Sequence, residues 1–357
     1  MVAAFHSAQS RSVENRDLLH DPHDQNHPIW GPASQTYAAL CNGAGAVIFF
    51  FVLSGFVLSL SLERGPSEIA PAARRFFVRR LFRLYPAVLS TVLLFAALFW
   101  IFGVRIPTVP PSCHALVSLL RNMLLLDTNI DGVMWALQLE LIAAPMIFAV
   151  VFMQRRWGTA PTLLLAVLLI ALSFASEWNR ILGPSAPPSM GRLYAFLFGV
   201  LLHRFGPPLA RCLPGRSAAV FFSLMVIIFF VARPIVGKTS QWSALVECFA
   251  AAGMIAVLVF CENTDFARPL DAGFFRFYGK LSFSFYLLHP LTLSVLWNNP
   301  GTISGLQGRG VPTIVIAFGL FVVSAAAITP VAWLSRTFVE LPGIALGRRL
   351  SRAPVDV

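Results

Sequence analysis

The chain has 357 residues, of which 57% are hydrophobic and only 12% are charged, and its mean hydropathy is +0.73. About a quarter of the residues in a soluble domain are charged, so this composition excludes a soluble domain and indicates a polytopic membrane protein. In a membrane protein, a net charge of +11 bears on which membrane face carries the basic residues. We therefore expect no nucleic-acid partner.

The N-terminal segment MVAAFH is apolar and typical of the last turns of a helix whose beginning is missing. We expect a complete chain to begin earlier, with a tenth span and its N-terminus inside. Residues 7–40 are polar and rich in Pro, Asn and Asp, which predicts an exposed loop. The loop holds residue types that suit a metal, but its prolines break any helix that would align them, so we assign no metal site. These residues are His20, Asp21, His23, Asp24 and His27.

Nine apolar stretches have lengths close to the ~20 residues that a membrane-spanning helix needs. They predict an all-α polytopic transmembrane helix bundle. They are 43–62, 85–104, 132–153, 159–175, 190–205, 217–234, 243–261, 278–297 and 312–335. If the loop at 63–84 is cytoplasmic, the inner segments hold 18 of the 27 Lys and Arg residues. This layout predicts that the C-terminus is inside, and we expect an integral protein of a bacterial cytoplasmic (inner) membrane. We expect residues 1–350 to form one transmembrane domain and 351–357 to form a cytoplasmic tail.

After the first complete span, five arginines lie in one stretch of ten residues, and no acidic residue between Glu68 and Asp127 neutralises them. They are Arg74, Arg75, Arg79, Arg80 and Arg83. At 100° per residue, the last four fall on one arc of a helix and Phe77, Val78, Leu81 and Leu84 fall on the other. The pattern predicts a helix that lies at the membrane surface with its apolar side down. Its arginines require an anionic partner, which is either lipid headgroups or a phosphorylated ligand.

Polar side chains within the predicted spans are costly and are therefore functional candidates. Glu140 lies near the middle of its span, and small residues surround it at helical spacing, namely Ala136, Ala143 and Ala144. The alternative is a glutamate that is hydrogen-bonded in a helix interface. Trp135 is interpreted as an interfacial or pocket-lining aromatic residue.

The span at 278–297 carries a polar stripe spaced four, four and three residues apart, which lines a cavity or another helix. Its members are Tyr278, Ser282, Tyr286 and His289. Ser54 and Gly55 lie in the middle of the first complete span, where small residues also permit close packing. Arg192 and Glu247 lie closer to span ends, from which they can reach the membrane interface.

Six segments in this order resemble the integral-membrane acyltransferase family 3, and the resemblance extends from about His6 to Leu350. They are GAGAVIFFFVLSGFVL, RRFFVRRLFRLYP, MWALQLELIAAPM, GRLYAFLFGVLL, YGKLSFSFYLLHPL and FVELPGIALGRRL. His6 matches a family histidine that an arginine precedes by eleven positions, but here that arginine would lie before Met1. Either the chain is truncated or the enzyme has lost an essential part. Ala136 replaces a serine of the family's Trp-Ser-Leu-x-x-Glu motif.

The resemblance implies transfer of an acyl group, with acetyl as the expected one, from acyl-coenzyme A to a hydroxyl of an extracytoplasmic glycan or lipid-linked sugar. His6 would be the general base, because a neutral imidazole suits proton removal from a sugar hydroxyl. Glu140 would orient that imidazole or pair with the missing arginine. The five arginines would bind the phosphates of the donor. The pocket would be formed by Ser54, Gly55, Phe56, Trp135, Tyr286 and His289.

Acyl-coenzyme A is then expected as a co-substrate, with no permanently bound cofactor, and membrane lipids are expected as further partners. One alternative is a transporter or flippase in which Glu140, Arg192 and His289 line a translocation path. The chain shows no internal repeat of the kind that transporters usually have. Another alternative is an inactive, truncated member of the family.

Overall fold

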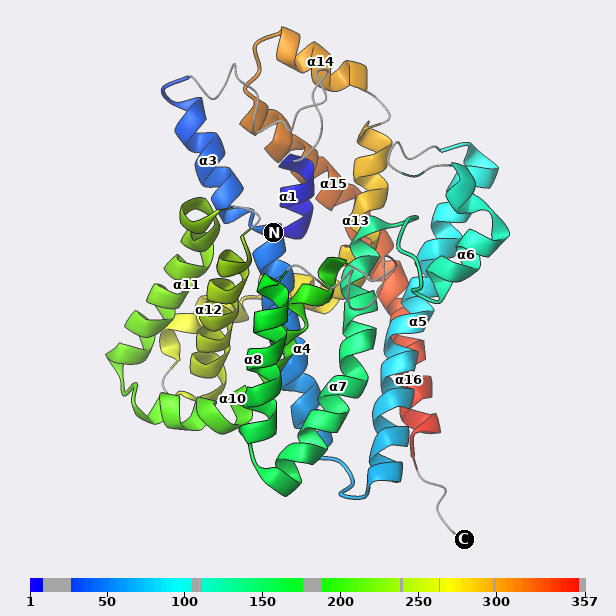
Figure 1. Ribbon diagram of the computed structural model, residues 1–357. Helices are drawn as coiled ribbons and strands as arrows, with labels where there is room; N and C mark the ends of the chain where they lie inside the picture. The colour runs from blue at the N-terminus through cyan, green and yellow to red at the C-terminus, as the bar shows by residue number, and fades with distance from the viewer. Residues whose placement is uncertain are drawn as a thin grey trace. The chain divides into compact units, whose positions relative to one another are not determined.

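The computed structural model describes residues 1–8, 27–104, 109, 111–175, 188–237, 240–262, 264–297 and 300–352. Every regular element within these residues is a helix (Figure 1). The predicted all-α polytopic helix bundle is therefore confirmed. Seven segments of the described chain are long and apolar enough to cross a membrane. They are Trp30–Glu63, Ile69–Phe102, Gly132–Trp157, Met190–Arg211, Arg216–Val236, Gln241–Phe260 and Thr313–Leu350.

Two of the nine predicted spans fall on helices outside this group of seven. The span predicted at 159–175 is helix α8, Ala160–Phe174, which is apolar but shorter than the others. The span predicted at 278–297 is part of α13, Gly273–Trp297, whose first turns carry Arg276 and Lys280. Length and apolar character thus single out seven segments, although each predicted span does coincide with a helix.

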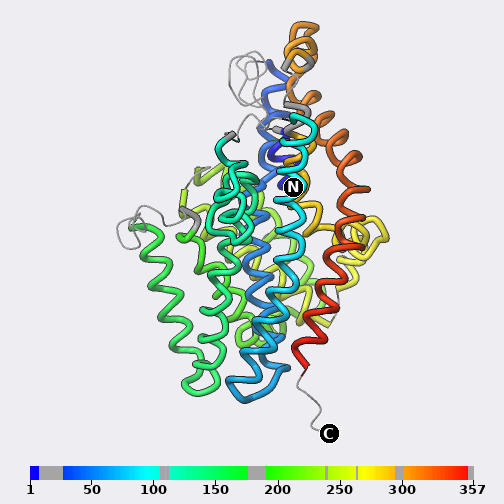
Figure 2. The backbone as a smooth tube through the Cα atoms, turned by 90° about the vertical axis from the view of Figure 1, so that its right-hand side faces the viewer, coloured from blue at the N-terminus to red at the C-terminus, as the bar shows by residue number. Residues whose placement is uncertain are grey.

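The arginine-rich segment and the span after it form one helix, α5, Ile69–Phe102 (Figure 2). Its 34 residues correspond to a length of about 51 Å, against a hydrocarbon core of about 30 Å. The helix predicted at the membrane surface is thus continuous with the span predicted from residue 85, and Pro86 lies inside α5 without ending it. The assignment of the two arcs is wrong in part, since Arg80 is buried and Leu81 is 41% exposed.

The chain forms two compact units. The first unit comprises Met1–Gly43, Leu81–Met134 and Phe277–Gly347, and the second comprises Ala44–Arg80, Trp135–Arg276 and Arg348–Val357. Helices α5 and α13 each contribute residues to both units.

The first unit contains mainly the N-terminal and C-terminal elements of the chain. Its elements are α1 (Val2–Ala8), α3 (Trp30–Leu40), the second part of α5, η2 (Pro111–His114), α6 (Leu116–Met123), η3 (Gly132–Met134), most of α13, α14 (Pro300–Gly308), α15 (Thr313–Ser335), the π-helix η6 (Arg336–Glu340) and most of α16 (Leu341–Leu350). Helix α15 contacts both α1 and α3, far from it in sequence. Glu340, at the end of the π-helix, is buried and accepts a hydrogen bond from Ser284 Oγ at 3.1 Å.

The prediction of an exposed loop over residues 7–40 is wrong for its last part, which is helix α3. Tyr37 of this helix packs against a buried cluster of Ile303, Ile316 and Ala317. Pro32 is tolerated because it lies in the first turn, where the backbone N–H groups have no partner within the helix. Tertiary packing therefore stabilises a segment whose composition indicates a loop.

The second unit contains most of the long apolar helices. Its elements are α4 (Gly43–Glu63), the first part of α5, α7 (Trp135–Trp157), α8, η4 (Pro188–Arg192), α10 (Tyr194–Arg211), α11 (Arg216–Val236), α12 (Gln241–Phe260) and η5 (Asp265–Asp271). Helix α12 packs against both α10 and α11, which Figure 1 shows in green. Helices α4 and α10 cross at two glycines: a Cβ at Gly55 would lie 2.0 Å from the Phe196 carbonyl oxygen, and one at Gly199 would lie 2.0 Å from the Val52 carbonyl oxygen. Only glycine permits so close a crossing.

Candidate active site

Glu140 lies at the centre of a buried polar cluster in the second unit. Arg80 Nη2 is 3.1 Å from Glu140 Oε1 and also donates to the Glu140 carbonyl oxygen at 2.6 Å. Ser54 Oγ donates to the same carboxylate oxygen at 3.1 Å. The side chains of Arg80 and Glu140 are only 5% and 7% exposed, so water screens their attraction little.

Helical spacing explains how these groups reach one another. On α5, Ala72, Phe76 and Arg80 recur every four residues, and all three are buried. On α7, the small residues around Glu140 are buried as well, as the sequence predicts for a face that admits another helix. A single cation thus takes the position that an apolar residue would occupy on α5, where it neutralises the carboxylate.

Glu140 is thus a member of an ion pair, and its second oxygen, Oε2, is buried without a hydrogen-bond partner among the described residues. Removing one member of such a pair leaves the other charge uncompensated in a medium of low dielectric constant. The arrangement therefore holds α4, α5 and α7 in a fixed relation within the second unit.

Two aromatic residues precede members of this polar cluster in the sequence: Phe51 precedes Ser54 on α4, and Trp135 precedes Glu140 on α7. Their rings pack edge to face with a centroid separation of 5.8 Å, and Phe51 stacks on Phe196 at 4.7 Å. The Arg192 guanidinium lies over the Trp135 ring at 5.1 Å from its centroid. A cation in this position is attracted electrostatically to the face of the indole ring. Trp135 therefore lies among packed aromatic rings and beside a cation.

The other arginines of α5 have different surroundings. Arg74 is exposed and donates to the Leu350 carbonyl oxygen at 3.2 Å, while Arg79 Nε donates to Ser351 Oγ at 2.9 Å. Arg348 and Arg352 lie close enough to Arg79 to interact with it electrostatically. Arg83 is also exposed and belongs to the first unit, within electrostatic range of Glu340. Within the described part of the chain, no carboxylate forms an ion pair with Arg74, Arg75 or Arg79.

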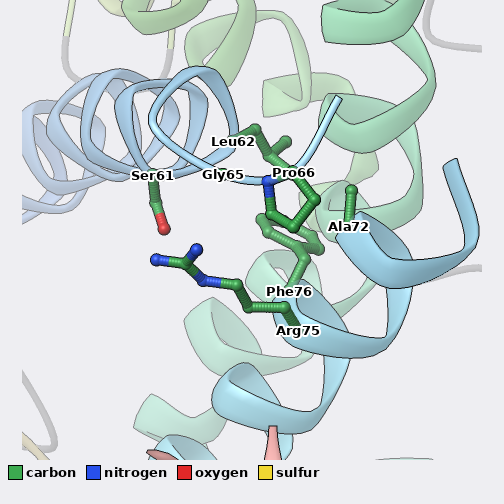
Figure 3. A pocket seen from close by; sticks show the side chains of 7 residues that line it. All are labelled: Ser61, Leu62, Gly65, Pro66, Ala72, Arg75 and Phe76. Carbon is green, nitrogen blue, oxygen red and sulfur yellow. The ribbon is translucent and has the colours of Figure 1, made fainter. Parts of the chain in front are cut away.

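Arg75 lines a small pocket at the start of α5 (Figure 3). The other lining residues are Ser61, Leu62, Gly65, Pro66, Ala72 and Phe76. The Ser61 hydroxyl and the Arg75 guanidinium point toward each other across it (Figure 3). Arg75 Nε is buried and has no hydrogen-bond partner among the residues that the structure describes. A hydroxyl and a guanidinium together suit a phosphate oxygen.

A second polar cluster, in the first unit, is centred on two histidines. His289 Nε2 lies 3.2 Å from His6 Nδ1, and His289 Nδ1 lies 2.7 Å from the Tyr286 carbonyl oxygen. The two imidazole rings are 5.1 Å apart, and His289 is fully buried. The Tyr286 hydroxyl donates to the Val133 carbonyl oxygen at 2.7 Å.

The polar stripe predicted on α13 bridges to other elements at three of its four positions. Tyr278 contacts Thr329 of α15 at 3.2 Å, Tyr286 contacts η3, and His289 contacts α1. Ser282 is exposed and bonds to the Gly279 carbonyl oxygen of its own helix. The remaining pocket candidates of α4, Gly55 and Phe56, lie where α4 packs against α10, and Phe56 stacks on His203 at 4.7 Å.

The sequence pattern did not indicate one buried carboxyl, Asp131, and misplaced another, Glu247. Asp131 is 1% exposed; its Oδ1 accepts a hydrogen bond from Val133 N–H at 3.3 Å, and burial raises the pKa of its carboxyl to about 8. An aspartate directly before an apolar run is a helix-start signal that could have drawn attention to it. Glu247 was expected to reach the interface, yet its side chain is fully buried, with Arg233 donating to both carboxylate oxygens at 2.8 Å.

The predicted metal-type residues His20, Asp21, His23 and Asp24 lie outside the described residues. His27 is described, and its Nδ1 accepts the backbone N–H of Ile29 at the start of α3. Among the described residues, no group of three or more His, Cys, Asp or Glu side chains has the arrangement of a metal site.

Comparison with known proteins gives one match. A family model described as an acyltransferase domain, acyltransferase family 3, matches residues 4–334. No curated protein and no solved structure gives a significant match to the chain. The family model covers His6, the arginines of α5, Glu140 and His289, and hence both polar clusters. The chain therefore belongs to acyltransferase family 3 and is an integral-membrane acyltransferase.

Proposed function

We propose that this protein is an O-acyltransferase that moves an acyl group, acetyl in the first instance, from acyl-coenzyme A to a hydroxyl of an extracytoplasmic glycan or lipid-linked sugar. The observation that carries the proposal is the contact between His6 and the fully buried His289 in the first unit, in a chain of an acyltransferase family. A sugar hydroxyl is a weak nucleophile until a base removes its proton, and imidazole suits this task near neutral pH.

In the proposed reaction, His6 accepts the hydroxyl proton while the hydroxyl oxygen attacks the thioester carbonyl carbon. The C–S bond then breaks, and the imidazolium returns the proton to the sulfur of the departing coenzyme A. The products are the acyl ester and free coenzyme A, so atoms and charges balance without a further reactant.

Donor binding is proposed for Arg74, Arg75 and Arg79. The support is the absence of ion pairs at Arg74, Arg75 and Arg79 in the described chain and the proximity of Arg348 and Arg352 to Arg79. Guanidinium groups bind phosphates through paired N–H donors, and coenzyme A carries several phosphate groups. Arg80 takes a different role in this proposal, because it already binds Glu140.

The first test is the substitution His6→Gln in protein reconstituted into nanodiscs. Release of coenzyme A from acetyl-coenzyme A should fall by about 10²–10⁴-fold, the usual contribution of a general base. Binding of coenzyme A to this variant should be unchanged. The triple variant Arg74→Gln, Arg75→Gln, Arg79→Gln should instead bind coenzyme A more weakly.

Retention of full activity by His6→Gln would remove the proposed base. Solute flux in proteoliposomes that needs no acyl-coenzyme A would favour a transporter instead. The exposed Ser282→Ala on α13 serves as the control for expression and insertion.

A further inference from the structure

The contacts of His289 determine which nitrogen of His6 carries a proton. A carbonyl oxygen can only accept a hydrogen bond, so the 2.7 Å contact between His289 Nδ1 and the Tyr286 carbonyl requires a proton on Nδ1. In a neutral imidazole the other nitrogen, Nε2, is then an acceptor. The 3.2 Å contact between His289 Nε2 and His6 Nδ1 therefore needs His6 Nδ1 as the donor.

The neutral form of His289 follows from its surroundings. It is fully buried, its ring stacks parallel to Phe285, and its two ring nitrogens face a carbonyl and a second imidazole. Within the described residues, no carboxylate forms a hydrogen bond or ion pair with either histidine. A buried charge without a counter-charge is costly, so the neutral ring is favoured.

The sequence explains the contact between His289 Nδ1 and the Tyr286 carbonyl oxygen. Residue 290 is a proline inside α13, and proline has no backbone N–H. The Tyr286 carbonyl, four residues earlier, therefore lacks the helical donor that residue 290 would otherwise provide. The His289 ring occupies that position, and the His-Pro dipeptide thereby fixes the ring's tautomer and orientation.

We infer that His289 is a positioning residue that holds His6 in the tautomer with its proton on Nδ1, so that His6 Nε2 presents a lone pair to the substrate. This inference rests on the proposed function, in which His6 is the general base. When His6 Nε2 accepts the hydroxyl proton, the His6 Nδ1–H···Nε2 His289 hydrogen bond becomes charge-assisted and stabilises the imidazolium. In serine proteases a buried aspartate performs the same task for the catalytic histidine.

The direct test is solid-state NMR of the full chain in lipid bilayers, with ¹⁵N-labelled histidine. The His6 signals are assigned by their loss in the His6→Gln variant. In the unsubstituted protein, His6 should show a protonated Nδ1 and an unprotonated Nε2. A proton on His6 Nε2 would overturn the inference, whatever the enzyme's activity.

Two substitutions of His289 separate positioning from packing. His289→Asn places an amide near the former Nδ1, where it reaches the Tyr286 carbonyl but not His6, and kcat should fall by about 10²–10⁴-fold with KM unchanged. His289→Gln places an acceptor near the former Nε2 and should retain more activity than the Asn variant. Equal activity of the Asn variant and the unsubstituted enzyme would contradict the inference.

The substitution Pro290→Ala restores a backbone donor for the Tyr286 carbonyl without altering either histidine. It should loosen the His289 ring and give His6 a mixture of tautomers, with a few-fold loss of kcat. Pro330→Ala, a substitution of another intrahelical proline on α15, is the matched control and should leave the His6 signals unchanged. Full activity of His6→Gln together with a protonated His6 Nδ1 would refute the proposed base and leave the tautomer assignment standing.

Discussion

Asp131 in the first unit and Glu140 in the second are both carboxylic acids with little exposure, 1% and 5%. Glu140 has a guanidinium at 3.1 Å and a hydroxyl donor. Asp131 has only a backbone N–H on one oxygen, and its other oxygen, Oδ2, has no hydrogen-bond partner among the described residues. The second unit thus holds an ion pair, whereas the first holds a carboxyl without a cationic partner among the described residues, Asp131, and two imidazoles in contact with each other. A buried carboxylate that is paired with a cation and a buried carboxyl that is not therefore lie in different units of one chain.

The largest effect is expected at the glycine crossing that places α4 in the second unit. In Gly55→Ala the new Cβ would lie 2.0 Å from a backbone oxygen of Phe196, so the two helices must separate. We expect loss of more than about 4 kcal/mol of stability, beyond the range of ordinary substitutions, or no folded protein. Thermal unfolding in detergent measures this. Gly279→Ala, with nothing within 4 Å of the new Cβ, is the control and should melt close to the unsubstituted protein.

The next effect concerns the ion pair itself. Arg80→Met and Glu140→Gln should each cost about 3–5 kcal/mol, because each leaves a buried polar partner uncompensated. The double variant should be more stable than the sum of the two losses predicts, since neither charge remains. Denaturant titrations of all four proteins provide the coupling free energy. Additive losses would show that the two side chains do not act as a pair. The substitution Arg74→Met, at an exposed position, should leave the free energy of unfolding nearly unchanged.

The smallest effect is a pH dependence at Asp131. Its pKa is raised to about 8 in the folded protein, so the folded state favours the protonated carboxyl. The stabilising contribution is therefore complete below the unfolded pKa near 3.9, and it is lost as the pH rises toward about 8. Asp131→Asn removes this titration and keeps an acceptor for Val133 N–H. The stability difference between the two proteins should change by about 1.4 kcal/mol per pH unit between pH 5 and pH 7. Melting curves that shift in parallel with pH would refute the neutral carboxyl.

The sequence was sufficient for the helical class, for the approximate position of each predicted span and for the family. It was also sufficient for Glu140 and its small-residue face, because both depend on spacing within one helix. Arg80 was assigned to the exposed arc because a helical projection does not show how far a helix continues or which side of it other helices cover. The contact between His6 and His289 joins residues 283 positions apart, so no local pattern contains it. Helix α3 was missed because its stability depends on tertiary packing.

The π-helix at Arg336–Glu340 has a consequence for the register of the C-terminus. A π segment accommodates one surplus residue, so α16 is rotated by about 100° from the frame that α15 would impose. Downstream of it, Gly343 packs so closely on α5 that an added Cβ would lie 2.8 Å from the Phe82 carbonyl oxygen and from Pro86 Cγ. Deleting a single residue from the π segment would turn a side chain into that contact. The close packing of α16 on α5 therefore depends on a surplus residue located outside the contact itself.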